Sequence, residues 1–299
     1  MADLFDSIDD VQSALLTGRY IADRALATVI FLATRLGKPL FLEGEAGVGK
    51  TEVAKVLADV FQTHLIRLQC YEGLDVHSAV YEWAYARQIM HLRLLEARGE
   101  ASTASEKDLY SVEFLIARPL LQAVQWNGSL PPVLLIDEID RADEEFESFL
   151  LEFLSDFQIT IPEIGTIRAM RPPIVVITSN RTREVHDALK RRCLYHWIDY
   201  PTFEAEYQIV MLKVPGITQQ LAFQVTTVCQ QLRQAELFKA PGIAETLDWA
   251  TALVTMGRQE LDEVTVNETL GVLLKYQDDV QRVRGEMAHE LVQRAHGRR

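Results

Sequence analysis

Residues 44–51 decide the fold class, and they read Gly44-Glu45-Ala46-Gly47-Val48-Gly49-Lys50-Thr51. They match the pattern GxxxxGK[ST], in which backbone N–H groups surround phosphates, the lysine neutralises the outer phosphates and the hydroxyl ligates Mg²⁺. A short apolar run at 40–42 precedes this stretch, and apolar residues at helical spacing follow it over 53–61. The context predicts a strand, a phosphate loop and a helix in an α/β domain that binds ATP and Mg²⁺. The alternative is a glycine turn with an exposed lysine, and the flanking strand and helix argue against it.

Further apolar runs predict the other strands of a parallel sheet. These runs are 64–70, 133–136, 174–177 and 194–198. A segment of 62 residues, 71–132, separates the second strand from the third, whereas a plain crossover needs only about a dozen. We therefore expect an insertion here, with helical pieces near 79–97 and 112–125 and a polar loop at 99–107.

Helices and one hairpin complete the predicted elements. Residues 21–36 have helical spacing, and Asp143 can cap a helix whose apolar stripe runs over 146–154. Residues 157–161 alternate with period two and 166–169 return after a turn, which predicts a β-hairpin. Beyond Pro201 the patterns are helical, over 203–214, 218–237, 244–256 and 266–283. The boundary between an α/β unit and a helical unit is therefore expected near Pro201.

Two carboxylates, Asp137 and Glu138, directly follow the predicted strand 133–136. Ligands bind at the carboxyl ends of parallel strands, so one acid can support Mg²⁺ beside Thr51 and the other can polarise water. We assign the metal to Asp137, water activation to Glu138 and orientation of that water to Asn180. Strand-end acids are often helix caps or solvated, and a strand-end asparagine is often a turn former. The phosphate loop 86 residues upstream favours the catalytic interpretation.

With these motifs the chain resembles the AAA+ ATPases, with 44–51 as Walker A, 133–138 as Walker B and Asn180 as sensor 1. The resemblance covers most of the chain, and it implies a three-layer αβα core with a parallel sheet in residues 1–201. It implies a smaller, all-helical lid domain in residues 202–299. The insertion at 71–132 and the hairpin at 157–169 resemble the helix-2 and pre-sensor-1 insertions of the MoxR group.

Two stretches are most similar to the CoxD branch of that group, the carbon monoxide dehydrogenase maturation ATPases: LLIDEIDRADEEFESFLLEFLSDFQITIPE and TSNRTREVHDALKRRCLYHWIDYP. This branch implies a chaperone-like ATPase that forms a hexameric ring and works beside a von Willebrand factor A domain protein. Its implied client is a metalloenzyme, such as a molybdenum hydroxylase like carbon monoxide dehydrogenase, whose metal centre it helps to install or activate.

The family pattern also assigns roles to less distinctive residues. It makes Arg192 the arginine finger, with Arg191 as the other candidate, and the alternative is a basic, solvated turn. Tyr20 and Ile21 stand where relatives line the adenine, although they can equally begin a packed helix. The lid stretch 241–246 lacks the arginine that many AAA+ proteins carry as sensor 2, which leaves that contact open.

Composition excludes several other classes of protein. The 299 residues are 48% hydrophobic and 24% charged, as in globular proteins, and a net charge of −13 repels nucleic-acid phosphates. The longest nearly uncharged apolar stretch, 25–34, is about half of the 20 residues that span a bilayer. No signal peptide is visible, so we predict a cytoplasmic protein without a membrane span or a nucleic-acid partner. The three cysteines and seven histidines form no zinc motif, so any metal is expected to arrive with a ligand.

Two rival functions remain open from the sequence. One is a nucleic-acid motor or loader of the same fold, against which the net charge argues. The other is a nucleotide-gated scaffold with little turnover, which a measurement of hydrolysis with and without a partner would separate from a remodelling ATPase.

Overall fold

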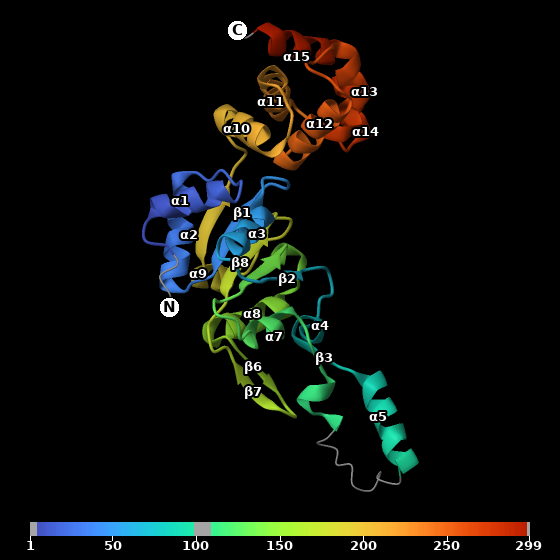
Figure 1. Ribbon diagram of the computed structural model, residues 1–299. Helices are drawn as coiled ribbons and strands as arrows, with labels where there is room; N and C mark the ends of the chain where they lie inside the picture. The colour runs from blue at the N-terminus through green and yellow to red at the C-terminus, as the bar shows by residue number, and fades with distance from the viewer. Residues whose placement is uncertain (1–4, 99–108, 298–299) are drawn as a thin grey trace. The chain divides into compact units, whose positions relative to one another are not determined.

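The computed structural model describes residues 5–98 and 109–297, which form two compact units (Figure 1). The first unit comprises the described residues of the ranges 1–11, 24–43 and 54–196. The second unit comprises those of 12–23, 44–53 and 197–299. The phosphate loop of residues 44–51 therefore clusters with the C-terminal helices. The expected division into domains at 1–201 and 202–299 stays a prediction.

A five-stranded sheet organises the α/β core. In spatial order its strands are β2 (Leu65–Gln69), β5 (Val133–Asp137), β8 (Ile174–Ser179), β1 (Leu40–Gly44) and β9 (Leu194–Ile198). The pairs β2–β5, β5–β8 and β1–β8 are parallel, and Leu134 of β5 lies between Ile66 and Val175 of its neighbours. Every residue of β1 and β5 is buried, as the uninterrupted apolar runs predicted. All five predicted strands are confirmed.

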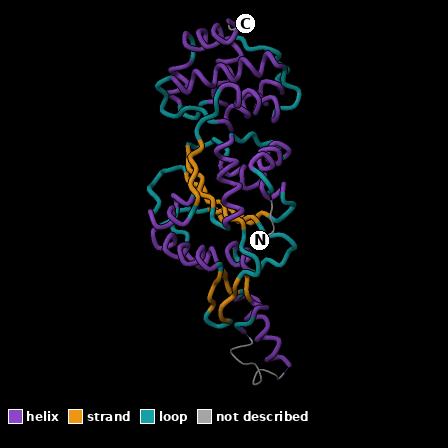
Figure 2. The backbone as a smooth tube through the Cα atoms, turned by 90° about the vertical axis from the view of Figure 1, so that its left-hand side faces the viewer, coloured by secondary structure: helices purple, strands orange, loops and turns teal. Residues whose placement is uncertain are grey.

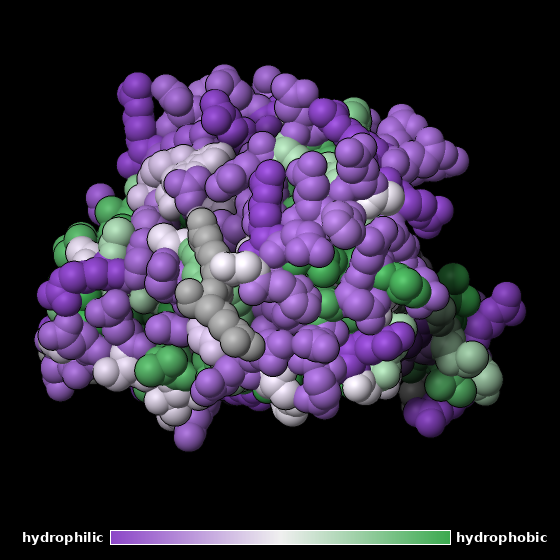
Figure 3. Space-filling view, turned by 90° about the horizontal axis from the view of Figure 1, so that it is seen from above, coloured by the Kyte–Doolittle hydropathy of each residue, from purple (hydrophilic) through white to green (hydrophobic). Residues whose placement is uncertain are grey.

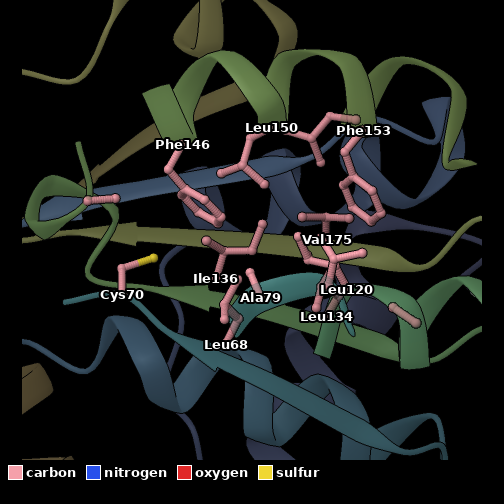
Figure 4. Close-up of a cluster of buried hydrophobic side chains, with 14 of the residues drawn as sticks. Leu68, Cys70, Ala79, Leu120, Leu134, Ile136, Phe146, Leu150, Phe153 and Val175 are labelled. Carbon is pink, nitrogen blue, oxygen red and sulfur yellow. The ribbon is translucent and has the colours of Figure 1, made fainter. Parts of the chain in front are cut away.

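Helices lie on either side of this sheet (Figure 2). On one side lies α8 (Glu144–Asp156), and the carboxylate of its N-cap residue Asp143 accepts a hydrogen bond from the Phe146 backbone N–H at 2.8 Å. This confirms the predicted cap. Phe146, Leu150 and Phe153 point from α8 onto the strands (Figure 4), where they join one buried cluster with α7 (Pro119–Val124).

Successive side chains of a strand point to opposite faces of the sheet. The strand residues that alternate with those under α8, among them Leu40, Leu135 and Val176, are equally buried and face the other side of the sheet. There α2 (Arg24–Leu36) and α3 (Lys50–Val60) supply buried residues such as Ile30 and Leu57. The three-layer αβα core is therefore confirmed.

The insertion between β2 and β5 is confirmed, but it is less helical than predicted. A two-stranded antiparallel sheet, β3 (Tyr81–Trp83) with β4 (Leu115–Ala117), interrupts both expected helices. In place of the first stand α4 (Val76–Val80), β3 and α5 (Tyr85–Arg98), and in place of the second stand the 3-10 turn η2 (Val112–Phe114), β4 and α7. Strand pairing between segments more than 30 residues apart overrode the local helical periodicity. The polar loop expected at 99–107 lies within residues that the structure does not describe.

The hairpin is confirmed. Its strands are β6 (Gln158–Ile161) and β7 (Gly165–Arg168), which pair antiparallel with Ile159 opposite Ile167. Both isoleucine side chains pack with the cluster under α8. The alternation predicted this correctly because only one face of the ribbon is buried.

After β9 the described chain is helical. The helices are α10 (Phe203–Lys213), α11 (Gln219–Gln234), α12 (Ile243–Thr255), α13 (Glu263–Leu273), α14 (Gln277–Val283) and α15 (Glu286–Gly297). They enclose a separate core that contains the fully buried Trp249. The face in Figure 3 is mostly hydrophilic, with scattered apolar residues.

Three details of the helices differ from the predictions. The single helix expected at 266–283 is two helices, α13 and α14, and in α14 the Asp279 carboxylate accepts hydrogen bonds from the backbone N–H groups of Phe238 and Lys239. Neither α15 nor the N-terminal α1 (Ile8–Thr17) was predicted. The helix expected from residue 21 begins only at Arg24.

Candidate nucleotide-binding site

The phosphate loop curls around its own lysine. Lys50 is only 6% exposed, and its Nζ donates to the carbonyl oxygens of Gly44 at 2.8 Å and Glu45 at 2.6 Å. Gly47 and Gly49 have φ of +79° and +95°, a backbone conformation that favours glycine. The loop leads directly into α3, which begins at Lys50 and contains Thr51 in its first turn. Backbone N–H groups at a helix N-terminus favour an anion. The loop from Gly44 to Thr51, which includes Ala46 and Val48, is therefore suited to the phosphates of ATP.

The first turn of α12 packs on this loop within the second unit. The Ala244 backbone N–H donates to the Gly47 carbonyl at 3.2 Å, and a Cβ on Gly242 would lie 2.8 Å from the Ala46 carbonyl oxygen. The Glu245 carboxylate accepts from the Gly242 N–H at 2.9 Å, in a capping box. The stretch without a sensor 2 arginine therefore does contact the loop, through backbone groups. Gly242 with Glu245 three residues later was a visible signal of this helix start.

Tyr20 also lies against the loop. Its ring atom Cε2 is 3.6 Å from the point where a Cβ on Gly49 would stand. Burial raises the pKa of Tyr20 above its usual range, and the negative charges of Asp23 and Glu52 add to this. Ile21 follows it, half-buried, in the segment between α1 and α2. Neither residue begins a helix, which removes the competing interpretation of this pair.

In the first unit, Asp137 ends β5 and is 2% exposed. Its Oδ1 accepts from the Thr178 hydroxyl at 2.5 Å, and its Oδ2 accepts from Arg67 at 2.6 Å and 3.1 Å. Hard oxygen ligands of this kind suit Mg²⁺. Asp137 therefore provides the type of ligand that a nucleotide-bound Mg²⁺ takes.

Glu138 follows in a left-handed conformation, φ 55° and ψ 51°, that is uncommon for a residue with a side chain. Its backbone N–H donates to the Thr178 hydroxyl at 2.9 Å, so Thr178 joins the two acids. The carboxylate forms an ion pair with Arg141 at 3.0 Å. Such local strain is typical of functional sites, and here the hydrogen bond that the Glu138 N–H donates to Thr178 of the neighbouring strand supports it.

Asn180 follows β8 at the same sheet edge, and its backbone N–H donates to Asp140 at 3.2 Å. Asp140 also accepts from the Thr182 N–H at 2.9 Å and the Thr182 hydroxyl at 2.6 Å. Burial raises the pKa of Asp140, but these hydrogen bonds outweigh it, and the net pKa lies below the usual value. A charged Asp140 thus fixes the backbone that carries Asn180.

Arg192 ends α9 (Asp187–Arg192), where its Nη1 donates to the Leu151 carbonyl at 2.6 Å. Arg191 is exposed as well, with its guanidinium 3.7 Å from Asp187, whereas Lys190 is half-buried. The basic run is therefore not uniformly solvated.

The structure thus gathers Asp137, Glu138 and Asn180 in the first unit, and the phosphate loop with Tyr20 in the second. Sequence inspection missed four of the supporting residues: Arg67, Asp140, Arg141 and Thr178. Thr178 and Asn180 have the two-residue spacing of one strand face, which was a usable signal. For Arg67, the sequence carried no such signal, because its partner Asp137 lies 70 residues away in the chain.

The family of AAA domains of the dynein-related subfamily matches residues 39–193, which is more than half of the chain. The chain therefore belongs to this family. Such AAA+ proteins in general bind ATP with Mg²⁺, hydrolyse it and assemble into oligomers. No curated protein matches the chain in sequence.

Among solved structures, the chain is similar to the RuvB Holliday junction branch migration motor of Thermotoga maritima. The identity is 17% over 83% of this chain and 67% of that chain, with a TM-score of 0.46. A point mutant of the same RuvB matches with 18% identity over 92% of this chain and 73% of that chain, with a TM-score of 0.49. No helix in the described ranges is long and apolar enough to cross a membrane.

Proposed function

We propose that this chain is an ATP-hydrolysing remodelling ATPase. Lys50 and Thr51 bind the phosphates and Mg²⁺, Asp137 supports the metal, Glu138 activates water and Asn180 positions it. Phosphoryl transfer needs placement and charge neutralisation more than covalent chemistry, which suits this set of residues. The observation that carries the proposal is the single hydroxyl of Thr178, which bonds both Asp137 and the backbone of Glu138.

The finer assignment is to the MoxR group and its CoxD branch, as a cytoplasmic hexamer. Arg192 of one subunit then completes the site of the next. The partners are a von Willebrand factor A domain protein and a client metalloenzyme. What supports this is the similarity of residues 134–163 and 178–201 to that branch, together with an insertion after β2 and a hairpin before β8.

Hydrolysis is tested with Glu138→Gln, which keeps the side-chain shape and removes the carboxylate. We expect ATP and Mg²⁺ binding to persist while turnover falls about 10²–10⁴-fold. Glu145→Gln, at an exposed position of α8, is the matched control and should turn over normally. Parent-level turnover in Glu138→Gln would assign water activation to another residue, and a parent protein without turnover would favour the scaffold function.

The maturation role needs a test in cells. Deletion of the gene should leave the client enzyme with an incomplete metal centre, which metal analysis of the purified client measures. The wild-type chain should restore it and Lys50→Ala should not. A fully loaded client in the deletion strain would refute this role, and DNA binding at physiological salt would favour the motor instead.

A further inference from the structure

Glu43 is a buried acid that takes no part in the roles assigned above. It is 4% exposed and precedes Gly44, where the phosphate loop begins. Its carboxylate is contacted by side chains from three other elements. The Tyr195 hydroxyl of β9 donates to Oε2 at 2.9 Å, Lys190 Nζ of α9 lies 3.3 Å from Oε1, and the Ser179 hydroxyl of β8 donates to Oε1 at 3.4 Å.

Lys190 is held from several directions. Besides its ion pair with Glu43, its ammonium lies 5.6 Å from the ring centroid of Phe41 and 6.0 Å from that of Tyr195. Both rings attract the cation through their negative faces. Burial, followed by the hydrogen bond to Glu43 and its charge, raises the pKa of Tyr195 to about 12, so the phenol remains a donor to Glu43 at neutral pH. Separating this partly buried pair would leave an uncompensated charge, so the contact between Glu43 and Lys190 is costly to break.

Lys190 of this pair lies in the same helical turn as the candidate arginine finger, Arg192. Helix α9 has only six residues, and Lys190, Arg191 and Arg192 form its last turn. Isolated helices this short are not stable in water, so the direction of the last turn must come from tertiary contacts. The structure shows two of these contacts: Lys190 with Glu43, and Arg192 with the carbonyl of Leu151.

The same carboxylate reaches the strand that leads to Asn180. Ser179 immediately precedes Asn180, and its hydroxyl also accepts from the Arg181 backbone N–H at 3.0 Å. Glu43 therefore connects three points: the end of the strand before the phosphate loop, the residue before Asn180 and the last turn of α9.

We propose that Glu43 and Lys190 are positioning residues that orient the last turn of α9, so that Arg192 is presented to the nucleotide of a neighbouring copy of this chain. The inference rests on the proposed function, in which that arginine acts between subunits. It adds that the acid beside one subunit's phosphate loop serves the site of its neighbour. Loss of the pair therefore impairs hydrolysis in the adjacent site and leaves ATP binding in its own site intact.

The test uses mixtures of variants of the full chain. Glu43→Gln keeps the shape and the hydrogen bond with Tyr195 but removes the charge that holds Lys190. Lys190→Met keeps an unbranched side chain of similar length and removes the cation. It serves as the second variant if Glu43→Gln folds poorly. A misplaced catalytic group costs on the order of 10²-fold in rate, so each variant alone should lose about that much turnover. Glu290→Gln, in an exposed ion pair of α15, removes an equal charge and should change nothing.

The reference mixture combines Arg192→Ala with Glu138→Gln, each inactive alone. It should regain turnover, because some interfaces then join an intact Glu138 to an intact Arg192. Glu43→Gln should behave like Arg192→Ala: it should regain turnover with Glu138→Gln and should not with Arg192→Ala. A purely structural defect would not distinguish these two partners. Calorimetry should show unchanged ATP affinity for Glu43→Gln.

The outcomes separate the two proposals. If the reference mixture stays inactive although light scattering shows co-assembly, the finger between subunits is wrong, and this inference falls with it. If the reference recovers but Glu43→Gln recovers with Arg192→Ala instead, Glu43 serves its own site and the positioning role is overturned. Recovery with neither partner, or full activity of both Glu43→Gln and Lys190→Met alone, overturns it equally.

Discussion

Replacing Arg233 by methionine would remove the buried cation that supports the first turn of α12. Arg233 is 5% exposed at its side chain, and its guanidinium forms a two-fold contact with the fully buried Glu206, at 2.5 Å and 2.6 Å. Its Nε also donates to the Pro241 carbonyl at 2.8 Å. Pro241 precedes Gly242, which packs on the Ala46 carbonyl of the phosphate loop. The change therefore affects both stability and nucleotide binding.

The magnitude follows from what remains around Glu206. Removing one partner of a buried ion pair costs about 3–5 kcal/mol, because the other charge is left uncompensated. Here Thr246 and Gln230 still donate to the Glu206 carboxylate, at 2.8 Å and 2.7 Å. We therefore expect the lower end of that range, and the lost bond to the Pro241 carbonyl adds about 1 kcal/mol. The free energy of unfolding of the second unit should thus fall by about 4 kcal/mol.

Urea unfolding followed by tryptophan fluorescence measures this, since Trp249 is fully buried in the same helical core. The double variant with Glu206→Gln provides the sharper test, because a neutral amide in place of the carboxylate no longer needs the cation. The two changes should cost at least about 2 kcal/mol less together than the sum of their separate costs. Costs that add within about 0.5 kcal/mol would refute the coupling. ATP affinity of Arg233→Met that equals that of the parent would refute the link to the phosphate loop.

Three further changes test the site. Lys50→Ala should abolish ATP binding in calorimetry while circular dichroism stays that of the parent, because the lysine neutralises phosphate charge; retained affinity would contradict the phosphate-loop assignment. Thr178→Val should cost about 1–3 kcal/mol and reduce turnover, since Asp137 loses a donor, whereas Thr178→Ser should stay near the parent in both urea unfolding and ATPase assays. Gly242→Ala should weaken ATP binding, because the new Cβ would lie 2.8 Å from the Ala46 carbonyl, and Gly271→Ala, with open space around it, is the control; equal affinities would show that α12 adapts.

Much of the α/β core could be predicted because its signals are local. Each strand of the sheet is a short apolar run. The helix start at Asp143 follows from the capping chemistry of an aspartate side chain. The hairpin at 158–168 follows from the alternation of apolar and polar residues. The insertion was harder, since the strand at 81–83 exists only because 115–117 pairs with it. A helical period does not reveal such a partner.

The sequence by itself determined the phosphate loop, the acid pair after the third predicted strand and the family, because these depend on the order and spacing of a few residues. Only the tertiary structure decided which side chains surround them. Asp137 meets Thr178 and Arg67, and Glu43 meets Lys190, across separations of about 40 to 150 residues. Parallel strands that are neighbours in the sheet are distant in the chain, so the groups that meet at their ends carry no common pattern in the sequence.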